Sequence, residues 1–321
     1  MAAQRASLGA GLGKRFRPGD PVFQGIMAVT ASVVLAVVLG LFIVLLKEAW
    51  PSIAKFGLPF LWRTRWDPPK QEFGAGAFIV GTLITAVAAL ILATTVAVLV
   101  AVYLVEVAPR WISRPVGYMV ELLAAIPSVV YGLWGVFVLG VFIRDHLGPL
   151  LTARLGWIPI FDGTPLVTGL FSAIVILSTM ILPTIMAVSR DVIAAVPRSQ
   201  REGILALGAT RWEMIRIAIL PYARSGILGA GILGLARAVG ETLAVTLVIG
   251  NRVAIPHTIF DGAYTMASAI ANQFAEVENS MHRAALFEVA LVLLGVTFLI
   301  NAAARLLIWR VTNGKRMVVV E

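Results

Sequence analysis

Two charged residues, Arg237 and Glu241, lie four positions apart inside a long apolar stretch, residues 225–251. Inserting a charged side chain at the centre of a membrane helix costs about 2.5–3.5 kcal/mol, so such residues are candidates for function. The planar guanidinium of arginine stays charged and can bind two oxygens of an anion such as phosphate. On one continuous helix the two residues would share a face and could pair. The spacing therefore fits either an anion pathway or a structural ion pair.

Small residues recur every four positions along the same stretch, which lets another helix approach closely. They are Gly226, Ala230, Gly234, Ala238, Thr242 and Thr246. Arg237 and Glu241 would lie about 60° to one side of this stripe. The pattern predicts that a partner's helix packs beside the two charges.

Other charges and prolines fall within apolar stretches, nearer their ends or at positions where a helix could kink. Glu121 and Glu288 are close enough to the ends of their stretches to reach an interface, or to act directly. Pro127 and Pro183 interrupt two further stretches. Backbone groups that such prolines free can be satisfied by neighbouring helices or by a water-filled cavity.

The composition identifies an integral membrane protein. Of 321 residues, 59% are hydrophobic, 13% are charged and none is cysteine, and the mean hydropathy is +0.92. Six apolar stretches are long enough to cross a membrane. The predicted fold is therefore all-α with six transmembrane helices, at about 26–46, 77–105, 115–143, 163–189, 225–251 and 284–304.

The basic residues predict the orientation of these helices. The net charge is +9, and alternate sides of the membrane carry 15 and 9 lysines and arginines. The positive-inside rule places the richer side, which holds both termini, in the cytoplasm. We expect a basic cytoplasmic tail over residues 1–25, a transmembrane domain over 26–309 and a second cytoplasmic tail over 310–321.

A long cytoplasmic connection, residues 190–224, is patterned as two short helices. Pro197 suits the first turn of a helix that Gly208 would end in a left-handed cap. Thr210 and Glu213 have the spacing of a capping box, and Pro221 is expected to end the second helix. Trp212, Ile215 and Ile219 would share one face. From this pattern alone, the hairpin could lie on lipid headgroups or insert into a partner's groove.

The stretch EGILALGATRWEMIRIAILP at 202–221 resembles the cytoplasmic signature loop of ABC importer permeases, with Gly203 and Ile204 where two alanines are usual. The resemblance implies the type I permease fold and a hairpin that docks onto a separate ATPase subunit. The candidate coupling residues are Glu202, Gly208, Ala209, Trp212, Leu220 and Pro221. The chain has no GxxxxGK[ST] phosphate loop, so ATP and its Mg²⁺ are expected on that ATPase and no cofactor on this chain.

Three motifs narrow the resemblance: ELLAAIPSVVYGLWG at 121–135, ILPTIMAVSRDVIAAVPRSQREGILALGATRWE at 181–213 and LARAVGETLAVTLVIGN at 235–251. Together they resemble the PstC family, permease subunits of the high-affinity phosphate importer of the bacterial inner membrane. The family implies a PstA-like second permease, a pair of PstB-like ATPase subunits and an external PstS-like phosphate-binding protein. Arg237 and Glu241 are then the candidate substrate pathway.

Several alternatives remain open at this point. The chain could import another oxyanion such as sulfate or molybdate, or be the homologous PstA-type subunit. A membrane enzyme is disfavoured because His146, His257 and His282 lack metal-ligand spacing and no Ser-His-Asp set is recognisable. The chain could also be a receptor-like scaffold that only signals. Such a scaffold would not need an ATPase whose turnover drives uptake. The basic residues fall in loops and tails of a membrane protein, and no nucleic-acid partner is expected.

Overall fold

The computed structural model describes residues 19–313, with side-chain surroundings for residues 22–310. The chain divides at Lys47–Glu48 into two compact units. Most of the predicted tails, 1–25 and 310–321, lies outside the described residues. The α-helices are α1 Gly19–Phe56, α2 Gly76–Val102, α3 Arg110–Ala125, α4 Ser128–Trp134, α5 Gly148–Leu155, α6 Leu170–Ala194, α7 Arg198–Ala206, α8 Arg211–Met214, α9 Leu220–Gly240, α10 Leu243–Val248, α11 Met266–Gln273 and α12 Ser280–Asn313.

Wider π-helical turns and short 3₁₀ turns link several of these helices. The π turns are Tyr103–Val107, Gly135–Gly140, Ile143–Leu147 and Ile215–Ile219, and the 3₁₀ turns are Leu58–Leu61, Pro159–Phe161 and Phe274–Glu276. No β-strand occurs in residues 19–313, apart from two isolated bridges.

In the described part of the chain, six helical segments are long and apolar enough to cross a membrane, which confirms the predicted all-α class. They are Val22–Phe56, Gly76–Val107, Ser128–Leu155, Leu170–Ala194, Arg211–Gly240 and Ser280–Arg310. Taken by itself, the first unit is a helix on which the side chains of residues 22–39 are exposed.

The core of the second unit lies where α2 packs along α6. Alanines at every third or fourth position of α2 face this contact and are at most 1% exposed: Ala86, Ala89, Ala93, Ala97 and Ala101. Small side chains allow two helices to approach closely where lipid provides no hydrophobic driving force between them. α6 packs on its other side against α9, so it lies at the centre of this unit.

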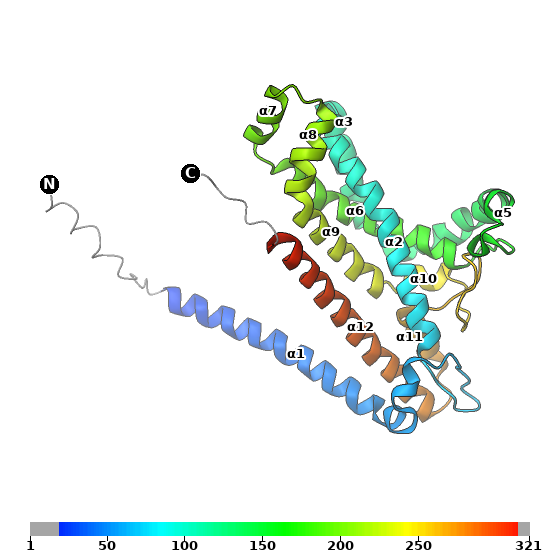
Figure 1. The fold of residues 1–321 in the computed structure, drawn as a ribbon. Helices are drawn as coiled ribbons and strands as arrows, with labels where there is room; N and C mark the ends of the chain where they lie inside the picture. Colours follow the sequence, from blue (N-terminus) through cyan, green and yellow to red (C-terminus); the bar gives the residue numbers. More distant parts are fainter. Residues whose placement is uncertain (1–18, 314–321) are drawn as a thin grey trace. The chain divides into compact units, whose positions relative to one another are not determined.

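Figure 1 shows α7 and α8 at one end of this unit and α11 at the other. At the α11 end, Phe73 and Phe78 pack around Trp66 with ring centroids 4.9 Å apart in each pair. His282 is 2% exposed and stacks on Phe73 at 5.5 Å. His282 is therefore part of an aromatic core.

The predicted third span, 115–143, is wrong as a single helix. α3 ends at Ala125, and Ile126 and Pro127 are extended, with ψ of 129° and 141°. Proline disfavours helical geometry in the residue before it, which explains the break. The segment long enough to span the membrane begins after the break and runs to Leu155. Pro183, by contrast, lies inside an uninterrupted α6.

Candidate functional site

Arg237 lies near the end of α9 with its side chain exposed. Its Nη1 donates to Thr184 Oγ1 on α6 at 3.4 Å, a long hydrogen bond. Thr184 directly follows Pro183 in the sequence. This places the guanidinium at the contact between α9 and α6, with donors left for a ligand.

Glu241 is not on the same helix as Arg237, which corrects the expectation of a shared helical face. α9 ends at Gly240, and Glu241 is extended, with φ −68° and ψ 126°. Its Oε1 accepts from the backbone amide of Ala244 at 3.3 Å, in the first turn of α10. Among the described residues, no ion pair within 4.0 Å joins Arg237 and Glu241. The carboxylate is used to begin the next helix, so Arg237 is not neutralised by it.

The small-residue stripe of α9 contacts α6 of the same chain, and not a partner's helix as predicted. Ala230 and Gly234 are buried. A Cβ added at Gly234 would lie 2.6 Å from Ile185 Cδ1, and one at Gly226 would lie 2.5 Å from Val192 Cγ1. The sequence pattern identified a close helix contact correctly but could not say which chain supplies the second helix.

Two interrupted helices meet close to Arg237. α4 packs against α10, and a Cβ added at Gly132 would lie 3.1 Å from the Cα of Ala244. At the break before α4, the carbonyl of Leu123 accepts from the amide of Ile126 at 3.3 Å and from the Tyr131 hydroxyl at 2.8 Å. Non-helical backbone at membrane depth is tolerated where it is buried in protein or lines a cavity. In many transporters, discontinuous helices of this kind form the substrate site.

The predicted hairpin geometry is present at the other candidate site. Gly208 follows α7 with φ +85°, in the left-handed region that favours glycine. Thr210 Oγ1 accepts from the amide of Glu213 at 3.3 Å, and Glu213 Oε2 accepts from the amide of Thr210 at 2.8 Å. These bonds form the capping box that begins α8.

Beyond the capping box the structure differs from the prediction. The helix does not stop at Pro221 but continues from Arg211 to Gly240 through the π turn Ile215–Ile219. A π turn shifts the hydrogen-bond ladder, and it directly precedes the point where proline lacks an amide hydrogen. The connection between the spans is therefore residues 195–210, shorter than the predicted loop 190–224. The helical turns on either side of this connection contain charged residues. Their low hydropathy is why they were predicted to belong to the loop.

The side chains of the hairpin separate into an inner and an outer set. Ile215 and Ile219 are 5% and 0% exposed, whereas Trp212 is 64% exposed, so the three do not share one face. Leu207 is 85% exposed and Glu202 is also exposed. Ala209 and Leu220 are partly buried. The outer set exposes apolar side chains and one carboxylate.

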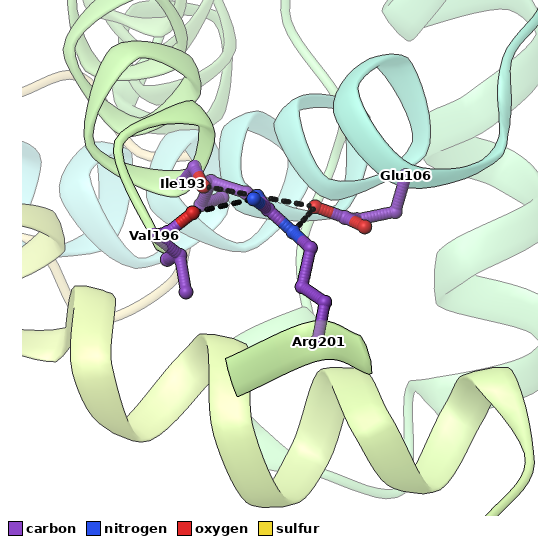
Figure 2. A network of polar contacts seen from close by, with 4 residues as sticks. All are labelled: Glu106, Ile193, Val196 and Arg201. Atoms are coloured by element: carbon purple, nitrogen blue, oxygen red, sulfur yellow. Dashed lines mark hydrogen bonds and ion pairs between the residues drawn. The ribbon is translucent and has the colours of Figure 1, made fainter. Parts of the chain in front are cut away.

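Arg201 joins the hairpin to the membrane helices, a link that sequence reasoning missed (Figure 2). From α7, its Nη2 donates to Glu106 Oε1 at 2.9 Å and to the carbonyl of Ile193 at 2.8 Å. Its Nη1 donates to the carbonyl of Val196. The side chains of Arg201 and Glu106 are 18% and 9% exposed. One guanidinium therefore ties α7 to the end of α2 and to the end of α6.

The remaining candidate charges have other surroundings. Glu121 pairs with Arg190 at 3.0 Å, between α3 and α6. Glu288 is 6% exposed within α12, and its Oε2 has no hydrogen-bond partner in the described part of the chain. No group of three or more metal-ligating side chains occurs within residues 19–313.

Within residues 19–313, six helices long enough to cross a membrane and a short capped hairpin held on two of them are typical of the class of multi-pass membrane transport subunits. Residues 93–313 match the family described as binding-protein-dependent transport system inner membrane component. Relatives named phosphate transport system permease protein PstC are 41% identical in Haemophilus influenzae, covering 92% of this chain and 96% of that one, and 43% identical in Pasteurella multocida, covering 82% and 83%. The chain belongs to the PstC family of ABC transporter permeases.

Solved structures show the same fold at low identity. A bacterial alginate ABC transporter, in complex with its alginate pentasaccharide-bound periplasmic protein, has a chain that matches with a TM-score of 0.60 and 16% identity, covering 88% of this chain and 92% of that one. A chain of the inward-facing MetNI methionine ABC transporter matches with a TM-score of 0.53 and 20% identity, covering 72% and 93%. In this family ATPase activity lies in a separate subunit, and the permease works with other transporter components.

Proposed function

We propose that this chain is the permease through which an ATP-driven importer moves inorganic phosphate across the inner membrane into the cell. Relatives about 40% identical over most of the chain carry the name of a phosphate transport permease. Arg237 supports the same substrate, because an exposed guanidinium beside two interrupted helices offers charge and paired donors to phosphate oxygens. Both termini lie in the cytoplasm, as the distribution of basic residues predicts.

The hairpin α7–α8 is the docking site for the ATPase. Its exposed Leu207, Trp212 and Glu202 face away from the membrane helices' packing, while Arg201 holds the hairpin on α2 and α6. A movement of the ATPase would thus be transmitted to α6. Thr184 of α6 accepts a hydrogen bond from Arg237. The partners are a PstB-like ATPase pair that binds ATP and Mg²⁺, a PstA-like permease and a PstS-like binding protein. This chain itself binds no cofactor.

The contacts of Arg237 favour a transport pathway over a structural ion pair. The neighbouring Glu241 caps α10, and within residues 19–313 the guanidinium makes one long hydrogen bond, to the Thr184 hydroxyl. A charge retained for architecture alone would be expected to have its counter-ion within reach. Arg237 therefore contacts phosphate during transport, and Glu241 shapes the backbone break beside it.

Uptake in cells that lack their own copy of this subunit tests the substrate. Cells that express this chain with its own transporter subunits should accumulate radiolabelled phosphate, and a large excess of sulfate or molybdate should not compete. Competition by sulfate or molybdate at concentrations similar to phosphate would assign the permease to another oxyanion. A Trp212→Ala variant should reduce uptake without reducing the amount of this chain in the membrane.

A further inference from the structure

Three arginines border a cavity at the hairpin end of the second unit. The cavity measures about 540 Å³ and lies between the end of α2, the first turns of α3 and the end of α6. Arg110 and Arg114 border it from α3, and Arg190 borders it from α6. Its lining does not include Arg237 or Thr184, so it is separate from the transport site.

The charges of this cavity are only partly balanced within the chain. Arg190 pairs with Glu121 at 3.0 Å and with Asp191 at 3.6 Å. Arg110 and Arg114 form no ion pair within 4.0 Å among the described residues, and both are exposed. Three arginines against two carboxylates leave one positive charge in excess, which suits a singly charged anion.

The backbone also makes room for this arrangement. A Cβ added at Gly117 would lie 2.5 Å from Arg190 Nη1, so glycine lets the guanidinium lie directly against α3. Arg190 can then bridge α3 and α6 through its ion pair with Glu121. The two free arginines remain available at the cavity's edge.

The outer surface of α3 is apolar next to these arginines. Trp111, Tyr118, Met119 and Leu122 are between 62% and 76% exposed. Aromatic rings and basic side chains together are typical of a helix at a membrane interface, where anionic headgroups and acyl chains lie side by side. Basic pockets between membrane helices bind such headgroups through their phosphate.

We propose that the cavity bordered by Arg110, Arg114 and Arg190 binds a phosphate group, supplied either by an anionic phospholipid or by free inorganic phosphate. The two free guanidiniums hold the phosphate oxygens, and the Tyr118 side chain borders the same cavity. A phosphodiester headgroup matches the single excess charge, and the apolar face of α3 would accommodate its acyl chains.

Native mass spectrometry of the assembled, delipidated transporter tests this site. Phosphatidylglycerol, phosphatidylcholine and inorganic phosphate are titrated separately, and binding of radiolabelled phosphate is followed in parallel by equilibrium dialysis. An Arg110→Gln/Arg114→Gln variant should bind the phosphate-bearing ligand about 30-fold more weakly than the wild type. The control Arg305→Gln/Arg310→Gln removes the same charge from exposed arginines of α12 and should bind as the wild type does.

A second variant tests the cavity without changing its charge. Ala194→Phe places a ring in the cavity and should weaken binding to a similar extent, while the complex assembles normally. A difference seen with phosphatidylglycerol alone identifies a lipid site, and one seen with inorganic phosphate alone identifies a site for the free anion. If neither ligand distinguishes the cavity variants from the α12 control, the proposal is wrong.

Discussion

At the scale of single residues, Arg237 is the side chain that we propose contacts phosphate. It is exposed at the contact of α9 with α6, and its only protein hydrogen bond recorded in the described residues is the 3.4 Å contact with Thr184. Hydrogen bonds to charged groups contribute about 1.5–3 kcal/mol. Removing the charge should therefore affect a bound anion much more than the fold.

We expect Arg237→Gln to reduce phosphate uptake about 10- to 100-fold while the complex still assembles. Glutamine keeps donor capacity but cannot offset the charge of phosphate. Arg237→Lys, which keeps the charge without the fork, should retain part of the activity. Uptake and assembled complex are measured separately.

Glu241→Gln is the matched change on the neighbouring carboxylate. An amide oxygen can still accept from the amide of Ala244, so assembly should persist and uptake should fall less than in Arg237→Gln. Recovery of uptake in the double neutral variant would show that the two residues act as a structural pair, and it would contradict a direct role of Arg237 in binding phosphate.

Substitutions at Gly208 test the effect of backbone conformation alone. Its φ is +85°, and a Cβ there would meet nothing within 4 Å, so a side chain brings strain without a clash. Gly208→Val should cost about 1–2 kcal/mol and weaken retention of the ATPase about 5- to 30-fold. Gly208→Asn should be much milder, because asparagine tolerates the left-handed region. Equal retention by both variants in a pull-down would argue against the docking role.

At the scale of elements, the bond between Arg201 and Glu106 connects the hairpin to the spans. Breaking a buried ion pair by removing one partner costs about 3–5 kcal/mol, because a buried charge is left unpaired. Arg201→Met and Glu106→Met should each lower thermal stability, and the double variant should recover much of it. If the pair transmits movement, the double variant should still transport less phosphate per ATP hydrolysed. An unchanged ratio of phosphate transported to ATP hydrolysed would show that the pair has only a structural role.

A turn at the far end of the unit gives a pH-dependent prediction. Burial opposes ionisation of Asp261, but the amides of His257 and Thr258 donate to its Oδ2 at 2.9 and 3.0 Å and hold the pKa of this carboxyl below its ordinary value. A lowered pKa contributes stability that is present above the unfolded value, about 3.9, and is lost as the pH falls through the folded value.

Hydrogen exchange at the amides of residues 257 and 258, corrected for intrinsic rates, should therefore show constant protection between about pH 5 and 7 and a loss below about pH 4. Asp261→Asn should weaken protection throughout. Asp162→Asn should not, because Asp162 is an exposed residue of a different loop, whose Ile160 carbonyl accepts from the amide of Ile259 at 2.9 Å. Full protection in Asp261→Asn at neutral pH would show that the carboxylate does not hold this turn.

Local features were predictable from the sequence, and features that depend on distant contacts were not. The left-handed Gly208 and the Thr210–Glu213 capping box need only neighbouring residues, and both are present. The extended Glu241 has no local signal, because it depends on how α10 packs against α4. Glu106 and Arg201 are 95 positions apart. Their charges at the edges of apolar segments were visible, but only the fold brings them together.

At the scale of the whole molecule, the chain is one component of a multi-subunit transporter. Its small-residue stripe packs against α6 of the same chain, so we expect the proposed second permease to contact a different surface. The sequence predicted the class, the family and the number of spans, but not the bounds of the third span. It could not predict which helices meet in the core, because the alanines of α2 and the glycines of α9 fit several partners equally well.

Reconstitution of purified subunits into liposomes tests the central claim most directly. We expect ATP-dependent uptake of radiolabelled phosphate only when this chain is combined with the second permease, the ATPase and the phosphate-binding protein. The chain alone, and the set without the ATPase, should show no energised uptake. Energised phosphate uptake by this chain alone, or a complete set that hydrolyses ATP without moving phosphate, would contradict the claim.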